Sequence, residues 1–249
     1  MIRRGTLAYL VTSAIFVIAG LSHAVPFTHQ GVPDDTRLPG PVLAPPPQVG
    51  SSTPWHIPEL YLDPMNIVMW ALLAAIWAMV TLDAVGQFID PSDDIAECDD
   101  LPHIWPLMSI ALIAATAMPW LLTRPFLLAA VAALGASCAI VAAGRAAGHR
   151  RPAIGFLAGW STAVFSATLA GLAADKLPVQ ALSALAILPG AAIGMAAQLW
   201  IGSSIGYSLA LIWAFCGLAV TTMGSDPMVA LAAILGISAM ATVLVRAAS

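Results

Sequence analysis

Charge is what this sequence has least of. Only 9% of its 249 residues are Asp, Glu, Lys or Arg, whereas 60% are hydrophobic. A water-soluble domain carries about 25% charged residues, so the polar surface that such a domain needs is missing. The nine basic residues are scattered and form no patch that could neutralise a phosphate backbone, which argues against nucleic acid as a partner. The composition predicts an integral membrane protein in a lipid bilayer.

Motifs for chemistry are missing as well. Cys98, Cys138 and Cys216 lie far apart and form no CxxC pair, so neither a disulfide framework nor a thiolate metal site is expected. No lysine falls inside a predicted span, which leaves no residue for a retinal Schiff base. His23 and His103 lie near predicted helix ends, where each could ligate a pigment magnesium or simply face the interface. HExxH, GxSxG and phosphate-binding glycine loops are absent, so we expect a non-enzymatic protein without catalytic residues or a metal site.

Long apolar runs dominate what remains. A helix needs about 20 apolar residues to cross the hydrocarbon core, and on that length the sequence contains eight candidate spans. The predicted fold is an all-α, polytopic transmembrane helix bundle. Residues 1–25 are expected to form an uncleaved signal anchor and residues 64–249 the bundle. The predicted spans are 6–25, 64–88, 104–122, 126–144, 153–173, 178–199, 204–222 and 227–246.

Residues 26–63 form the long loop of this topology. The segment holds nine of the nineteen prolines and is expected to cross the outer surface as extended chain. Arginines gather at the span ends on the side opposite this loop, for example in GRAAGHRR at 144–151. Because cytoplasmic loops collect basic residues, this distribution favours a cytoplasmic N-terminus and C-terminus. The predicted location is therefore a bacterial inner membrane, with residues 26–63 extracytoplasmic.

Small residues recur every four positions in two of the spans. One series is Gly155, Gly159, Ala163, Ala167 and Gly171, and the other is Ala186, Gly190, Gly194 and Gln198. Small residues at this interval let helix backbones approach closely in lipid. We therefore predict that Gly155, Gly159, Ala163, Gly171, Gly190 and Gly194 pack helices together.

The second span carries the polar and aromatic residues of interest. Asp83 and Gln87 share one helix face, with Asp83 about one and a half turns from the predicted cytoplasmic end. A carboxylate there can pair with a neighbouring helix or with water, or it can handle a ligand or a proton. Trp70 and Trp77 share a face, where indoles either pack a bundle or wall a flat apolar ligand.

Two segments resemble a known family. GWSTAVFSATLAGLAA at 159–174 and YSLALIWAFCGLAV at 207–220 are similar to the C-terminal half of the longer bacterial tryptophan-rich sensory proteins, the TspO/translocator protein family, close to the peripheral benzodiazepine receptor. The tryptophan span that follows a proline, Pro64 to Trp70, belongs to the same resemblance. It implies a five-helix core, here extended by the signal anchor and extra spans, that binds a porphyrin or another tetrapyrrole, sometimes a sterol, in a tryptophan-lined cavity. The matching positions are Trp70, Gln87, Trp160, Tyr207 and Trp213.

Two functions are therefore predicted. The first is a TspO-like binder of a hydrophobic ligand of the tetrapyrrole class, in sensing or transport. The second is a structural accessory subunit of a larger photosynthetic or respiratory membrane complex, packing against other subunits or pigments; a homo-oligomer is a further possible assembly. The predicted ligand-binding residues are Trp70, Trp77, Asp83, Gln87, Trp160, Tyr207 and Trp213.

Overall fold

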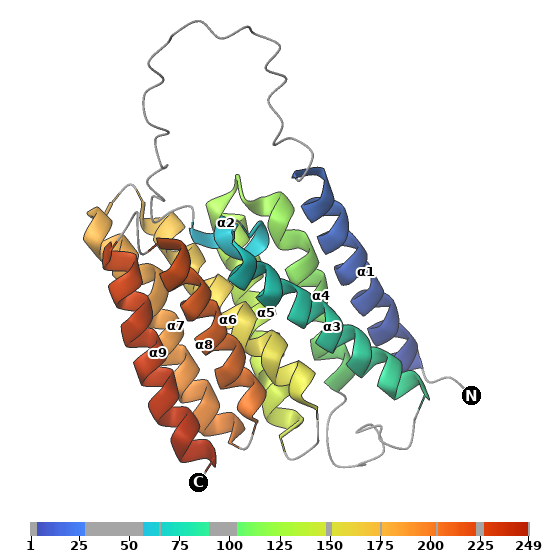
Figure 1. Ribbon diagram of the computed structural model, residues 1–249. Helices are drawn as coiled ribbons and strands as arrows, with labels where there is room; N and C mark the ends of the chain where they lie inside the picture. Colours follow the sequence, from blue (N-terminus) through green and yellow to red (C-terminus); the bar gives the residue numbers. More distant parts are fainter. Residues whose placement is uncertain are drawn as a thin grey trace, which may run out of the picture.

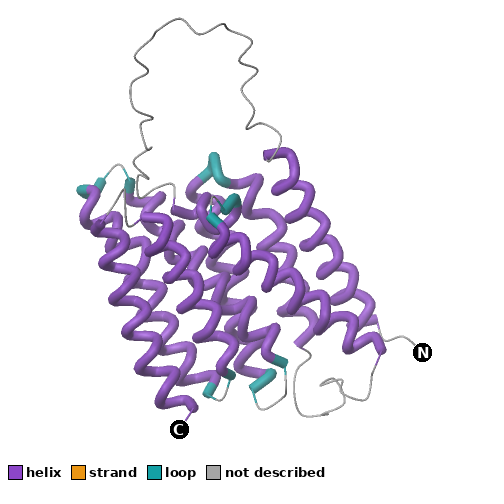
Figure 2. The backbone as a smooth tube through the Cα atoms, in the orientation of Figure 1, coloured by secondary structure: helices purple, strands orange, loops and turns teal. Residues whose placement is uncertain are grey.

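The fold is a bundle of long helices (Figures 1 and 2). The computed structural model describes residues 4–27, 57–64, 66–89, 104–147, 151–174, 176–202, 204–222 and 227–248, and these contain no strand. Eight of the described helical segments are long and apolar enough to cross a membrane, which confirms the predicted number of spans and the all-α class. The elements are α1 (Arg4–Phe27), α2 (Ile57–Leu62), α3 (Ile67–Ile89), α4 (Ile104–Ala117) with the 3₁₀ turn η4 (Met118–Leu121), α5 (Pro125–Arg145), α6 (Pro152–Ala173), α7 (Val179–Ile201), α8 (Ile205–Thr222) and α9 (Pro227–Ala248).

Proline and asparagine mark the helix starts. Pro125, Pro152 and Pro227 are the first residues of α5, α6 and α9, where a missing N–H loses no hydrogen bond. Asn66 caps α3, because its Oδ1 accepts a hydrogen bond of 2.8 Å from the backbone N–H of Met69. The same side chain donates to Thr221 Oγ1 and so joins the start of α3 to the end of α8. These local signals place the span boundaries within a few residues of the predicted ones.

The end of the proline-rich segment is helical, which corrects the prediction of extended chain there. Residues 57–62 form α2, with Pro58 in its first turn, where proline is tolerated. Ile57 and Tyr61 are almost completely buried, and α2 packs against α6. Burial of this apolar turn accounts for the helix. The rest of residues 26–63, and the acidic stretch at 90–100, lie outside the described residues.

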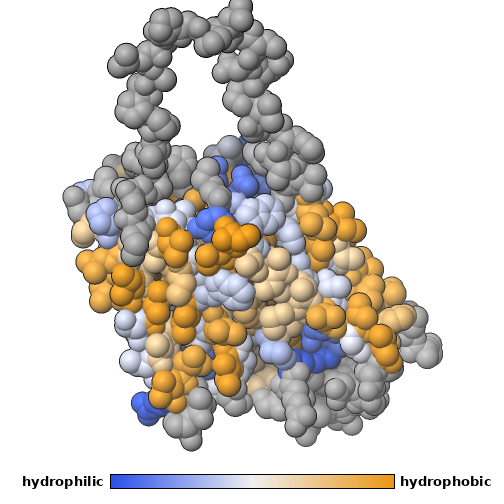
Figure 3. All heavy atoms as spheres, in the orientation of Figure 1, coloured by the Kyte–Doolittle hydropathy of each residue, from blue (hydrophilic) through white to orange (hydrophobic). Residues whose placement is uncertain are grey.

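Helix α6 is the centre of the bundle and α1 lies at its edge. In the apolar stretch of α6 that is long enough to cross a membrane, 89% of the residues are buried. In the corresponding stretch of α1, 17% of the residues are buried. Helix α6 contacts α5, α7 and α8, whereas the main neighbours of α1 are α3 and α4. On the face drawn in Figure 3, hydrophobic residues cover much of the middle of the bundle, and the most hydrophilic ones lie toward its ends. This distribution suits a multi-pass protein surrounded by lipid.

Both chain termini lie at the same end of the bundle, which we call the terminal end (Figure 1). The turn between α5 and α6 and the last residues of α3 are at this end, whereas α2 is at the opposite end. Because the chain crosses the bundle an even number of times, its two termini lie at the same end. The cytoplasmic location of the terminal end remains a prediction from its arginines.

Close approach of α6 and α8 depends on glycine. A Cβ at Gly159 would collide with the carbonyl oxygen of Tyr207, and a Cβ at Gly155 would lie 3.1 Å from the Tyr207 nitrogen. Ala163 is buried on the same helix. Gly171 departs from the predicted pattern, because a Cβ there would meet no atom within 4 Å. The close contact therefore ends before Gly171, the last member of the series.

The second small-residue series brings α7 against its neighbours. A Cβ at Gly190 would lie 2.7 Å from Ser166 Cβ of α6, and one at Gly194 would lie 2.8 Å from Met240 Sδ of α9. Pro189, inside α7, has no N–H to continue the helical ladder. Beside it, Ser166 Oγ accepts a 2.8 Å hydrogen bond from the Gly190 N–H. A polar contact thus supports α7 where proline interrupts it.

A buried glutamine closes the turn between α7 and α8. Gln198 is completely buried, and its Nε2 donates to the carbonyl oxygens of Gly202 at 2.7 Å and Ser204 at 3.1 Å. Its Oε1 accepts a 2.7 Å hydrogen bond from Ser208 Oγ of α8. Gly202 has a φ of 73°, a conformation that glycine adopts at little cost. One buried amide thereby holds two carbonyl oxygens of the turn and a hydroxyl of α8.

Candidate functional site

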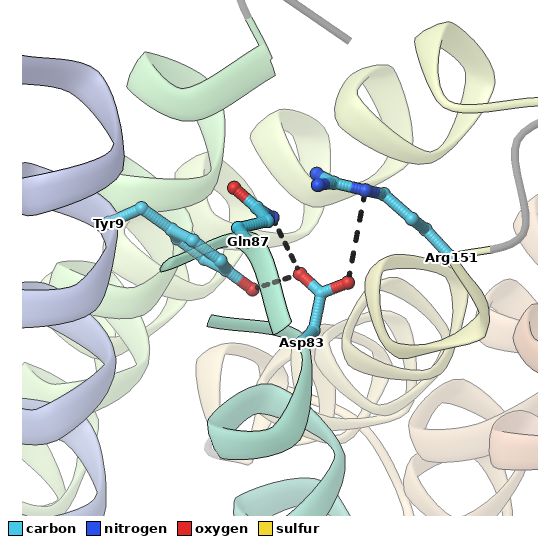
Figure 4. A network of polar contacts seen from close by, with 4 residues as sticks. All are labelled: Tyr9, Asp83, Gln87 and Arg151. Carbon is cyan, nitrogen blue, oxygen red and sulfur yellow. Dashed lines mark hydrogen bonds and ion pairs between the residues drawn. The ribbon is translucent and has the colours of Figure 1, made fainter. Parts of the chain in front are cut away.

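A polar cluster lies toward the terminal end and joins three helices (Figure 4). Asp83 Oδ2 accepts a 2.8 Å hydrogen bond from the Tyr9 hydroxyl of α1 and a 2.9 Å hydrogen bond from Gln87 Nε2. Asp83 Oδ1 lies 4.0 Å from Nε of Arg151, the residue just before α6. The Asp83 and Arg151 side chains are only 10% and 11% exposed. We call these four residues the polar clamp.

The clamp supplies the partners that a carboxylate needs when it leaves water. Two donors converge on one oxygen and the guanidinium balances the charge near the other, so the carboxylate of Asp83 is both paired and hydrogen-bonded. Because Tyr9 belongs to α1 and Arg151 begins α6, the clamp ties the peripheral helix to the core. The sequence left open whether Asp83 pairs with a neighbouring helix or with water, or handles a ligand or a proton. These contacts support pairing with a neighbouring helix.

A small cavity lies between the helices, on the side of the clamp toward α2. Its volume is about 20 Å³, enough for roughly one water molecule. The described part of its lining has four aromatic side chains, counting His23, and one hydroxyl, and contains no Lys, Arg, Asp or Glu. The lining residues are Phe16, Gly20 and His23 of α1, Leu62 of α2, Leu73 and Trp77 of α3, Ala115 and Thr116 of α4, Pro119 of η4 and Trp160 of α6. We call this space the aromatic cavity.

Trp77 is the unusual residue of the aromatic cavity. Its side chain is well buried, with 8% exposure, yet its indole N–H has no hydrogen-bond partner among the residues that the structure describes. Gly20 makes room for the ring, because a Cβ there would lie 2.8 Å from Trp77 Cε2 and 2.9 Å from Nε1. A buried donor without a partner costs about 1–3 kcal/mol. Such a group in a cavity wall is suited to bind an acceptor.

The remaining wall combines α1 with α6. The rings of Phe16 and Trp160 are 6.3 Å apart and inclined at 58°. At the α2 side, His23 meets Trp120 edge to face, with centroids 6.2 Å apart. Burial raises the pKa of Asp63, beside α2, while the neighbouring His23 opposes that shift and Glu59 adds to it. Four of the ten described lining residues are therefore aromatic, and His23, Glu59 and Asp63 gather at the α2 side of the cavity.

The structure divides the predicted ligand-binding residues among several places. Trp77 and Trp160 line the aromatic cavity. Trp70 packs against the edge of the core, and Trp213 Nε1 donates 3.2 Å to the carbonyl oxygen of Val68. Asp83 and Gln87 belong to the polar clamp, as described above.

Tyr207 has a structural partner in α6. Its hydroxyl and Thr162 Oγ1 are 3.0 Å apart, and both side chains are completely buried. Thr162 also donates 2.8 Å to the carbonyl oxygen of Ala158, so in the contact with Tyr207 its oxygen serves as the acceptor. This contact fastens α8 to α6 beside the glycines and lies outside the aromatic cavity.

Sequence reasoning missed the contribution of α1 to both sites. Tyr9 reaches Asp83 across 74 positions of the chain, and Phe16 and Gly20 form a wall of the cavity. The three residues recur at intervals close to one or two helical turns, which places them on one face. That spacing was a signal in the sequence, although it does not reveal which span faces α1.

The fold and its apolar surface define a multi-pass, all-α membrane protein. No family model, no curated protein and no solved structure matches the chain. The similarity to the TspO/translocator protein family therefore remains a prediction from the quoted segments.

Proposed function

We propose that the protein is a non-enzymatic membrane protein that binds a hydrophobic ligand in the aromatic cavity. The observation that supports this most directly is that Trp77 of α3 and Trp160 of α6 line one space together with Phe16 of α1. Flat aromatic walls suit a flat apolar ligand, since they offer a large contact area with few rotatable bonds. The tetrapyrrole class, in sensing or transport, is the specific candidate that the TspO resemblance adds.

The size of the cavity sets a condition on this function. Ligand sites are typically about 300–1,000 Å³, whereas the aromatic cavity has a volume of about 20 Å³. A tetrapyrrole does not fit while α1 occupies its present position. Binding therefore requires one wall to move, and the closed structure represents the ligand-free arrangement under this proposal.

Helix α1 is the wall best suited to move. It is the least buried of the spans, with 17% of its apolar stretch buried, and it provides Phe16, Gly20 and His23 of the cavity lining. The clamp holds its other half through Tyr9. Movement of the cavity half of α1 away from α3 would admit a ligand from the bilayer, with the clamp as the fixed point.

The first test is saturable quenching of tryptophan fluorescence by protoporphyrin IX in lipid nanodiscs. We expect Trp160→Phe to weaken binding because it removes part of the cavity wall. The matched control is Trp200→Phe, since Trp200 lies on α7 and is 59% exposed; this variant should bind like the parent protein. No saturable quenching in the parent protein, or equal loss in both variants, would contradict the proposal.

The second test asks whether the clamp half of α1 stays in place while the cavity half moves. Thr12 Oγ1 of α1 lies 3.5 Å from Ser109 Oγ of α4, which makes the two positions candidates for a disulfide after replacement of both by cysteine. In a background without Cys98, Cys138 and Cys216, we expect the oxidised Thr12→Cys, Ser109→Cys protein to bind protoporphyrin as the reduced protein does, because only the cavity half of α1 has to move. Loss of binding on oxidation that is restored by reduction would contradict the clamp as the fixed point.

The accessory-subunit hypothesis makes a different prediction for purification. A subunit that packs against other proteins or pigments should leave the membrane in mild detergent with a stable partner or a bound chromophore. A protein that elutes alone as a colourless monomer or dimer supports the ligand-binding proposal instead.

A further inference from the structure

We infer that the ligand presents a neutral hydrogen-bond acceptor, such as a carbonyl or ether oxygen, to the indole N–H of Trp77. This inference rests on the proposed function and specifies the chemistry of the same cavity. It follows from three properties of the cavity: its unpartnered donor, the absence of acidic and strongly basic lining residues, and its volume.

The first property is a donor without an acceptor. Trp77 Nε1 has no partner among the described residues, and indole has no second polar atom that could compensate. The nearby hydroxyl of Thr116 donates 2.7 Å to the Leu112 carbonyl oxygen of its own helix, and Trp77 Nε1 makes no hydrogen bond to it or to any other described residue. An acceptor oxygen on the ligand would remove the cost of this buried N–H.

The second property is the charge of the lining. Among the residues that the structure describes, the lining includes no Lys, Arg, Asp or Glu, and His23 is the titratable residue in it. A carboxylate or phosphate buried among these side chains would lack a fixed countercharge, which is unfavourable. The acceptor that meets Trp77 is therefore uncharged. For a tetrapyrrole, the acidic side chains would have to stay outside the cavity.

The third property is size. The aromatic cavity has a volume of about 20 Å³, which suits roughly one water molecule and hence a single ligand oxygen. The ligand oxygen would occupy this space beside Trp77, while the apolar body of the ligand would displace α1.

A matched pair of probes tests this chemistry. The ketone 9-fluorenone and the hydrocarbon fluorene have the same flat ring system and differ in one oxygen. Binding to protein in nanodiscs is normalised to partitioning into protein-free nanodiscs, which removes the difference in lipid solubility. We expect the parent protein to prefer the ketone by about 3- to 10-fold, the effect of one neutral hydrogen bond. Trp77→Phe should abolish the preference and Trp200→Phe should retain it.

The carbonyl stretching band of bound 9-fluorenone gives a readout that does not depend on any variant. A hydrogen bond from the indole lowers the frequency of this band, so the parent protein should show a shifted population that saturates with protein. If both probes bind equally and the band does not shift, the inference about the acceptor is wrong while the proposed function stands. If neither probe nor protoporphyrin IX binds, the proposed function itself fails.

Discussion

The closest backbone approach in the bundle yields the sharpest prediction. Replacement of Gly159 by alanine places a Cβ 3.0 Å from Ala210 Cβ and 3.2 Å from the Tyr207 carbonyl carbon. The optimal separation of two carbon atoms is about 3.5–4.0 Å, so α6 and α8 would have to separate by about 0.5–1 Å. The contact is with backbone, which cannot rotate away. Overpacking of this kind costs about 1–3 kcal/mol.

Gly171→Ala on the same helix is the matched control. A Cβ there would meet no atom within 4 Å. Replacing glycine by alanine also raises helix propensity, and this gain is larger at Gly159 in the middle of α6 than at Gly171 in its last turn, so any excess loss at Gly159 comes from the helix contact. We expect Gly159→Ala to lower the free energy of unfolding in detergent by about 1–3 kcal/mol relative to Gly171→Ala. Equal unfolding transitions, followed by circular dichroism in a denaturant series, would refute the packing argument.

Two further predictions concern buried polar groups. Tyr9→Phe should lower the free energy of unfolding by about 1–2 kcal/mol, because Asp83 loses a hydrogen bond in a site with little water. Arg151→Gln should cost less, since the ion pair is 4.0 Å long; a larger loss than for Tyr9→Phe would contradict this ranking. Gln198→Leu should cost about 1–3 kcal/mol, chiefly by leaving the buried Ser208 hydroxyl without its partner, because the two carbonyl oxygens of the turn lie on residues that are exposed or half-buried. Ser208→Ala removes only one of these bonds and should cost less than Gln198→Leu in the same assay.

The spans could be predicted because the bilayer imposes both their length and their apolar composition. Proline at the first position of α5, α6 and α9 supplied the boundaries. Helix α2 was not predicted, because a six-residue helix with a proline owes its stability to burial against α6 rather than to its own propensity. Four-residue spacing indicated Gly159 and Gly171 equally, but only the neighbouring helix decides which of them is in contact.

The candidate sites could be predicted only in part. Asp83 and Gln87 stood out because a carboxylate is rare in an apolar span, and their shared face follows from helical spacing. Their partners Tyr9 and Arg151 are distant in the chain, so helix arrangement rather than local pattern brings them together. The same limit applies to Trp77 and Trp160, whose common cavity depends on how α1, α3 and α6 meet.

Helix α1 connects the two sites in one physical arrangement. At its start Tyr9 is held by the buried carboxylate, and near its end Gly20 and Phe16 close the aromatic cavity. Polar attachment at the start is directional, whereas Phe16 and Gly20 make apolar contacts and His23, further along α1, contacts Trp120 and lies near Asp63. In lipid, apolar side chains lose little on moving from a helix neighbour to an acyl chain, because both surroundings are hydrophobic. Displacement of Phe16 and Gly20 therefore costs little, the contacts of His23 supply most of the cost at this end, and the unpartnered N–H of Trp77 lies where that displacement would expose it to a ligand.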